Sequence, residues 1–149
     1  MKFKYQKELE YFAAQGAKYP QLFVPNQKDA YRFAFAEDWS RSFIPPHKLH
    51  PNRLKQQIEK GQVELDGFAL SNLETLDKAN AFYSYLKKIC KNARKQIGDS
   101  ISYGIINIEN GIINIENGMV TSADSKGHFD LYESETCDLS TSFKIIKTL

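Results

Sequence analysis

The sequence predicts an α+β fold: one domain over residues 1–149, with a mainly antiparallel sheet and a C-terminal β-meander packed against one long helix and shorter N-terminal helices. Three observations predict it. The heptapeptide GIINIEN occurs twice in succession over 104–117, and each copy ends in an Asn-Gly pair, which between β-branched residues is a strong hairpin signal. Apolar residues recur at helical spacing over 73–97. Helical patterns come early, strand patterns dominate the end, and no linker divides the chain.

Composition limits the class of protein. A chain of 149 residues can bury a real core, and a formal net charge of +2 is too small to indicate a nucleic-acid partner by itself. No apolar run approaches the roughly 20 residues that span a bilayer, and residues 1–12 lack the apolar segment of a signal peptide. We therefore expect a cytoplasmic protein without a membrane partner. Cys90 and Cys137 have no metal-ligand spacing, so we expect both to be reduced and buried.

The N-terminal half is predicted to mix helices with one strand. Its elements are a helix over 2–15 ended by Gly16, a loop over 17–28, a strand over 31–36, an irregular stretch over 37–52 fixed by prolines, and a short helix over 53–59. The strand YRFAFA alternates aromatic and other residues, which places Arg32 on the face opposite Tyr31 and Phe33.

The middle of the chain contains the longest helical pattern. A short buried strand over 67–71 runs into a helix over 73–97, which Gly98 ends. Ser71 and Glu74 form a capping-box pattern at the start of this helix. Its buried stripe consists of Ala79, Phe82, Tyr83, Leu86, Cys90, Ala93 and Ile97, and its other face carries Lys87, Lys88, Lys91, Arg94 and Lys95.

The tandem repeat predicts a specific register. Two-residue turns at 110–111 and 117–118 would pair Glu109 with Ile112 and place Ile106, Ile108, Ile113, Ile115 and Val120 on one apolar face. A seven-residue period would flip faces in a straight strand, which favours a meander. Removing one copy leaves a complete hairpin, so the repeat reads as a tandem duplication; the alternative is an edge that pairs with a partner. Strands over 127–133 and 142–149 follow.

The basic helix face is a first candidate site. Its five cations, Lys87, Lys88, Lys91, Arg94 and Lys95, could release condensed counterions from nucleic acid. A solvated face that complements the helix dipole is the alternative.

The histidines are a second group of candidates. His47 and His50 form an H-x-x-H between prolines, but two imidazoles are too few for zinc, so no metal is expected. His128 heads a strand and could act as a general base.

Three further segments occur in a suggestive order. Arg32 lies on an early strand, Ser71 lies where a middle strand meets its helix, and Glu133 and Glu135 form E-x-E on a late strand. In this the chain resembles the ADP-ribosyltransferases of the R-S-E type. The resemblance implies that Arg32 binds the phosphates of NAD, that Ser71 braces the nicotinamide pocket, and that Glu135 is the catalytic carboxylate with Glu133 on the acceptor side. Tyr31, Phe33 or Tyr132 could provide a stacking wall for the nicotinamide, and strand period 2 would put both glutamates on one face.

Each of these residues also has a structural interpretation. Ser71 is fully explained as a helix cap. Glu133 and Glu135 could form a solvated strand edge, and Arg32 could pair with a carboxylate or stack on a ring.

Three functions follow from the sequence as hypotheses. The first is NAD-dependent transfer of ADP-ribose to a protein or nucleic acid, or hydrolysis of NAD as substrate, as in small bacterial toxins and defence proteins. The second is a non-catalytic accessory or immunity-type module that holds a protein partner through a sheet edge or the aromatic loop 39–44. The third is nucleic-acid binding by the basic face 87–95. Convergence of Arg32, Ser71 and Glu135 on one cleft is the geometric test of the first.

Overall fold

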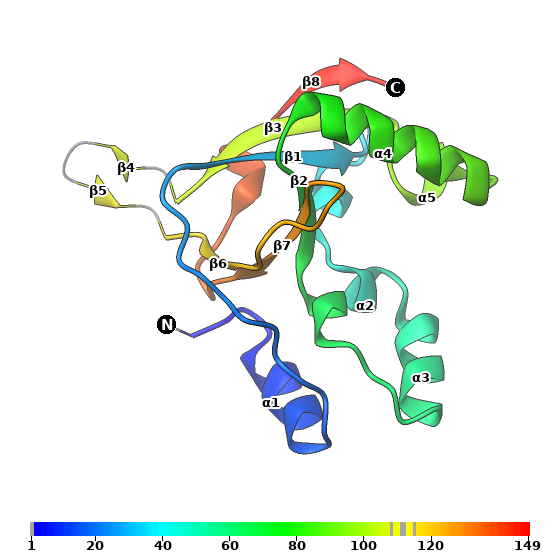
Figure 1. Cartoon of the computed structure of the whole chain (residues 1–149), viewed down its shortest axis with the longest axis vertical. Coiled ribbons are helices and arrows are strands. Elements are labelled where there is room, and N and C mark those ends of the chain that lie inside the picture. The colour runs from blue at the N-terminus through cyan, green and yellow to red at the C-terminus, as the bar shows by residue number, and fades with distance from the viewer. Residues whose placement is uncertain (1, 108, 111–112, 115) are drawn as a thin grey trace.

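Six antiparallel strands form the main sheet, in the order β6-β7-β2-β1-β3-β8 (Figure 1). The computed structural model describes residues 2–107, 109–110, 113–114 and 116–149. The strands are β1 (Lys28–Ala34), β2 (Leu70–Leu73), β3 (Ser100–Ile106), β6 (Gly118–Val120), β7 (His128–Glu133) and β8 (Lys144–Thr148). A separate two-stranded sheet joins β4 (Glu109–Asn110) and β5 (Ile113–Asn114). The predicted α+β class is confirmed.

The helices divide into two groups (Figure 1). The described helices are α1 (Gln6–Ala14), α2 (Pro46–Leu49), α3 (Pro51–Glu59), α4 (Leu76–Ile89) and α5 (Ala93–Gln96), with short 3-10 turns η1 (Trp39–Phe43), η2 (Leu65–Phe68) and η3 (Leu139–Thr141). In Figure 1, α4 runs beside β1, whereas α1, α2 and α3 gather at the opposite end of the view. Among the described residues, none of the helices is both long and apolar enough to cross a membrane.

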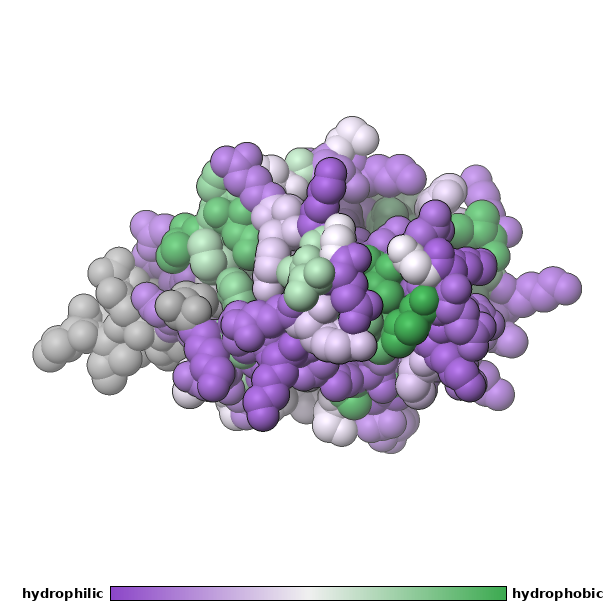
Figure 2. Space-filling model, turned by 90° about the horizontal axis from the view of Figure 1, so that it is seen from below, coloured by the Kyte–Doolittle hydropathy of each residue, from purple (hydrophilic) through white to green (hydrophobic). Residues whose placement is uncertain are grey.

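The core follows from the alternation of side chains along the strands. One cluster includes Ala30, Phe129 and Leu131 on one face of the sheet. A second packs α1 through Leu9 and Phe12 against η2. A third lies between α4 and the sheet. Seen from the side of α1 to α3, the surface is mostly hydrophilic, with apolar residues in small patches (Figure 2), as on ordinary soluble domains.

The predicted helix over 73–97 is shorter and broken. Ser71 lies inside β2, which pairs with β7, so the predicted Ser71–Glu74 capping box is wrong. The cap of α4 is Thr75 instead, whose hydroxyl accepts a hydrogen bond from the amide of Lys78 at 3.1 Å. Cys90 takes an extended conformation, which ends α4 and separates it from α5. The pairing of β2 therefore overrides a local capping signal.

The repeat does not extend the main sheet as predicted. Strands β4 and β5 pair Glu109 with Asn114, which differs from the predicted register, and β6 pairs with β7 rather than with the repeat. Ile106, at the end of β3, is buried as expected. The predicted turn at 110–111 and the predicted positions of Ile108, Ile112 and Ile115 lie outside the described residues, and so does the side chain of Ile113.

Two asparagines of the repeat close the base of this hairpin. The amide of Asn107 donates to Oδ1 of Asn117 at 2.7 Å, and the amide of Asn117 donates to Oδ1 of Asn107 at 2.6 Å. Asn107 adopts a φ of 55°, a conformation that asparagine tolerates better than most residues. Side-chain amides thus replace the ladder hydrogen bonds of the predicted three-stranded meander.

Candidate functional site

Arg32 lies where β1 and β2 diverge. These two strands pair at Tyr31 and Leu73. At the next residue of β1, the guanidinium of Arg32 bonds to β2 where a backbone hydrogen bond would otherwise lie. Its Nη1 donates to the carbonyl of Ser71 at 2.5 Å, and its Nη2 donates to the carbonyl of Ser42 at 2.6 Å. Because backbone carbonyls need partners when they are buried, Arg32 ties β2 and η1 to β1.

The Nε atom of Arg32 has no hydrogen-bond partner. The side chain is 7% exposed, and its Nε is buried without a hydrogen-bond partner. Burial lowers the pKa of Arg32 to about 10, although Glu133 and Asp130 act in the opposite direction. The guanidinium is therefore charged at neutral pH with its Nε–H unused, and leaving such a buried donor unpaired costs about 1–3 kcal/mol or more.

A pocket of about 240 Å³ opens beside Arg32, between β1, β2, η1, α2, α3 and α4. Three more basic side chains line it, namely Arg41, His50 and Arg53. Among the described residues that line this cationic pocket, none is Asp or Glu. The rest of its lining is mostly apolar, with the polar residues Ser42, Ser71 and Gln96, and it includes three aromatic rings, from Phe33, Phe35 and Phe82.

The local potential in the cationic pocket is positive. Burial lowers the pKa of His50, and the charges of Arg53 and Arg41 lower it further. Arg41 is held over the ring of Phe35, with Cζ at 4.2 Å from the ring centre. A groove of about 550 Å³ shares His50 and Arg53 with the pocket and continues past Lys91. Guanidinium groups arranged in this way suit a phosphate, which they can bind in a bidentate manner.

A polar group of three side chains adjoins the cationic pocket. Ser71, which lines the pocket, shares a hydrogen bond between its Oγ and Nε2 of His128. Oδ1 of Asp130 lies 3.6 Å from the same nitrogen. Ser71 and Asp130 are direct partners across β2 and β7, which puts them on one face of the sheet. In a serine-hydrolase triad the carboxylate contacts the other ring nitrogen, so this group is not such a triad.

Asp130 also lines a second pocket. This pocket, of about 390 Å³, is bordered by Lys18, Tyr19, Glu64, Asp66 and Tyr132 among others, and we call it the acidic pocket. Burial raises the pKa of Asp130 to about 6; Asp66 and Asp124 act in the same direction, against His128 and Arg32. Asp130 is thus a carboxyl group that titrates near neutral pH between two pockets of opposite charge.

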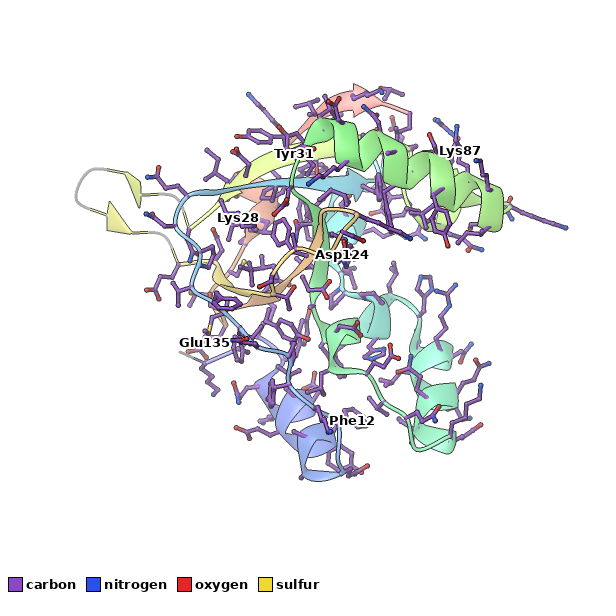
Figure 3. All side chains as sticks on the ribbon, in the orientation of Figure 1. Phe12, Lys28, Tyr31, Lys87, Asp124 and Glu135 are labelled. Carbon is purple, nitrogen blue, oxygen red and sulfur yellow. The ribbon has the colours of Figure 1, made fainter. Side chains whose placement is uncertain are left out.

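Two of the predicted NAD-site residues come together and three do not. Arg32 and Ser71 line the cationic pocket, but Tyr31 packs against Tyr103 at 4.9 Å between ring centres. Figure 3 shows Tyr31 near the start of α4. Phe33, two residues further along β1, supplies the aromatic wall instead.

The two glutamates lie elsewhere. Glu133 is 3% exposed, and its Oε2 is 2.7 Å from Nζ of Lys4, which also donates to the carbonyl of Cys137. Glu135 is exposed in the turn after β7, where its amide donates to the carbonyl of Lys2 (Figure 3). The expected shared strand face is wrong because β7 ends at Glu133. Arg32, Ser71 and Glu135 do not converge on one pocket.

The predicted basic face is divided by the break at Cys90. Lys87 and Lys88 belong to α4, whereas Arg94 and Lys95 belong to α5. Nζ of Lys87 lies 5.6 Å from the ring centre of Tyr83, and Arg94 donates to the carbonyl of Leu149. Lys91 lies between the helices and lines the groove that joins the cationic pocket.

The two histidines of the H-x-x-H separate. His47 is buried, with Nε2 at 2.7 Å from the carbonyl of Glu64. A Cβ at position 67 would lie 2.1 Å from its ring, so glycine is required there. His50 faces the cationic pocket instead. Within the described ranges, no three His, Cys, Asp or Glu side chains form a group suited to a metal ion.

The structure also shows the surroundings of the two cysteines and of the aromatic loop 39–44. Both thiols are free; Cys137 is buried as expected, but Cys90 is partly exposed because it lies at the helix break. The loop from 39 to 44 is packed rather than free. Nε1 of Trp39 donates to the carbonyl of Ser140 at 2.9 Å, and Phe43 packs edge-on against Phe143.

Apart from Arg32, sequence reasoning did not assign the charged residues of the two pockets to a binding site. The alternation over 127–133 was a usable signal for Asp130, because it places that residue on the face of His128. Arg41 comes from the irregular stretch 37–52, where no periodic pattern predicts the direction of a side chain. Arg53 opens the predicted helix 53–59, but no sequence pattern indicated the pocket that it lines. Comparisons of the chain with models of protein families, with curated proteins and with solved structures gave no match, so the geometry of the two pockets carries the functional argument.

Proposed function

We propose that the protein binds a nucleotide through its phosphates in the cationic pocket, with NAD as the first nucleotide to test. One observation carries the proposal: Arg32, Arg41, His50 and Arg53 line one pocket, without a carboxylate among its described lining residues. The choice of NAD rests on the resemblance to the R-S-E enzymes, whose phosphate-binding arginine and pocket serine correspond to Arg32 and Ser71.

The free energy of binding would come mainly from the guanidinium groups. Like charges in a confined, partly apolar pocket repel one another, and a phosphate relieves that repulsion. Arg32 is held in place by two carbonyls, so it loses little rotamer freedom on binding and still has Nε to donate. The rings of Phe33 and Phe82 offer an apolar surface to a base.

The catalytic extension of this proposal is ADP-ribosyl transfer or NAD hydrolysis of the toxin or defence type. Either reaction calls for a carboxylate near the ribose, to stabilise positive charge as the glycosidic bond breaks. Asp130 approaches the cationic pocket through the Ser71–His128 hydrogen bond. Glu133 forms an ion pair with Lys4, and Glu135 lies in the turn after β7, away from the cationic pocket. We therefore assign the catalytic role to Asp130.

Calorimetry with NAD, ADP and inorganic pyrophosphate tests the binding step. The double variant Arg41→Ala/Arg53→Ala is expected to weaken binding by about a hundredfold, tenfold for each lost phosphate contact. The matched control is Lys87→Ala/Lys88→Ala, which removes the same charge outside the pocket lining. An equal loss in the control, or no binding of any of the three ligands, would refute the proposal.

Turnover of labelled NAD tests the catalytic step separately. We expect Asp130→Asn to abolish turnover and Glu135→Gln to retain it. The opposite result would return the catalytic role to Glu135. Nucleotide binding without turnover in the wild-type protein would make the protein a binding module rather than an enzyme.

Nucleic-acid binding is a second candidate because the groove beyond His50 and Arg53 reaches Lys91. A single strand could place one phosphate in the cationic pocket and others along this groove. The logarithm of its affinity should fall linearly with the logarithm of salt concentration, with a slope of about −0.7 per neutralised phosphate. Lys91→Ala should reduce that slope, whereas a slope near zero would exclude this function.

A further inference from the structure

We propose that the acidic pocket binds a small alkyl amine in its ammonium form, at a site that adjoins the proposed nucleotide site through Asp130. The pocket is bordered by Glu64, Asp66 and Asp130 against one cation, Lys18. Two tyrosines, Tyr19 and Tyr132, complete the polar lining on which the argument rests. The ligand class follows from the charge of the pocket, from one unused hydroxyl and from the volume of the pocket.

The unused hydroxyl belongs to Tyr132. This residue is 1% exposed, and its Oη is buried without a hydrogen-bond partner. Burial raises the pKa of Tyr132, and the acidic groups that raise it further are Asp130, Asp66 and Tyr19. All three also line the acidic pocket. Tyr132 thus lines the acidic pocket, and its buried hydroxyl oxygen has no protein partner and lies within the field of that pocket's acidic groups.

An ammonium group matches these acceptors. It carries three N–H donors and no acceptor, and the pocket offers the Tyr132 oxygen together with the carboxylates of Asp66 and Asp130. Mutual repulsion between Asp66 and Asp130 contributes to the raised pKa of Asp130. A bound cation relieves that repulsion, and tyrosine rings add a favourable face for an organic cation.

A metal ion is a poorer fit. No three carboxylates, histidines or cysteines in the described part of the chain come together as a metal ion needs. The volume of about 390 Å³ also exceeds what a compact ion fills. An alkyl chain of a few carbons can occupy the remainder against Pro20, Val63 and Leu65, which line the same pocket. These features favour an alkyl amine over an inorganic cation.

Putrescine is the probe, and 1,4-butanediol is its neutral counterpart of equal length. Calorimetry near pH 7 should detect putrescine binding that weakens by about tenfold in Tyr132→Phe and in Asp66→Asn, since each removes one acceptor of a charge-assisted hydrogen bond. The control is Glu59→Gln, an exposed carboxylate at the end of α3 that is not among the lining residues of the acidic pocket. Unchanged melting temperatures would show that the variants are folded.

Proton linkage gives a second readout. The charged and titratable groups that act on Asp130 are Asp66, Asp124, His128 and Arg32. An ammonium bound beside Asp130 favours its ionised form, so binding near pH 6 should release protons and give different heats in two buffers of different ionisation enthalpy. Affinity should fall between pH 7 and pH 5 in the wild type, and less in Asp130→Asn.

Four results would overturn the assignment. They are equal binding of butanediol, no detectable binding at about 10 mM putrescine, full affinity in Tyr132→Phe, and an equal loss in Glu59→Gln. The proposed nucleotide site can fail independently: Arg41→Ala/Arg53→Ala should leave putrescine binding intact, and Tyr132→Phe should leave nucleotide binding intact.

Discussion

The two pockets on either side of Asp130 differ in how their charge is fixed. In the cationic pocket three guanidinium groups remain charged at any ordinary pH, and Arg32 is held by two backbone carbonyls. In the acidic pocket the charge depends on Asp130, whose pKa is raised to about 6 by burial and by Asp66. One pocket therefore has a permanent potential, and the other has a potential that pH can change.

One lining residue of each pocket also has a buried polar atom without a partner. In the cationic pocket it is Nε of Arg32, and in the acidic pocket it is Oη of Tyr132. Buried polar groups in folded proteins are nearly always paired. Among the described residues, four buried side-chain atoms lack a partner, on Arg32, Asn72, Tyr132 and Glu133. Arg32 and Tyr132 each line a pocket of matching chemistry, which supports ligand binding in both pockets. The difference in charge determines the ligands: an anion for the first and an ammonium ion for the second.

The largest expected effect separates the structural role of Arg32 from its binding role. Arg32→Met removes the donors to the carbonyls of Ser71 and Ser42 and should lower the free energy of unfolding by about 3–5 kcal/mol. Urea denaturation measures this change. A loss below about 1 kcal/mol would mean that the two carbonyls find other partners, and Arg32 would then be free to act as a ligand group alone.

The next effect concerns the charge of the acidic pocket. Because the folded pKa of Asp130 is raised above its ordinary value, the folded state binds a proton more tightly than the unfolded chain between about pH 4 and 6. The contribution of Asp130 to stability is therefore lost as pH rises through that window, by roughly 1–3 kcal/mol. Urea denaturation at pH 4.5 and pH 7.5 should show this loss in the wild type and not in Asp130→Asn. Parallel behaviour of the two proteins would contradict it.

A smaller effect reports on the cationic pocket. His50 has a lowered pKa, so the unfolded chain binds its proton more readily, and the stability linked to His50 decreases as pH falls through about 6.5. In an NMR titration, Arg53→Ala should raise the His50 pKa, because it removes a neighbouring positive charge. Pyrophosphate should raise it further. A His50 pKa that responds to neither change would show that the imidazole does not sense the pocket.

The smallest effect is expected from the repeat. Deleting residues 108–114 restores a single copy and leaves Asn107 and Asn117 separated by two residues, the spacing of a tight hairpin. No residue that the structure describes in this region lines the cationic or the acidic pocket. The free energy of unfolding should change by less than about 1 kcal/mol, with both ligand affinities unchanged. A weakened affinity would show that the hairpin supports one of the pockets.

Local patterns were enough to predict much of the fold. The alternation over 127–133 corresponds to β7, and the pattern over 53–59 lies within α3, because both signals depend on side chains close together in the sequence. The repeat was correctly read as a hairpin former. The strands with which it pairs were predicted incorrectly. The prediction counted only hydrogen bonds between backbones, whereas the side chains of Asn107 and Asn117 accept hydrogen bonds from each other's backbone amides.

The sequence by itself determined the α+β class and the type of several elements, including the strand over 127–133 and the helix over 53–59. Arg32 and Ser71 were named together as candidate site residues because of the resemblance to the R-S-E enzymes. Tertiary structure alone decided that Glu135 lies away from that site and that Arg41, His50 and Arg53 join it. It also decided that Asp130 lies between two pockets of opposite charge. The physical reason is that pockets form where segments distant in the sequence meet, and the divergence of β1 from β2 has no local sequence signal.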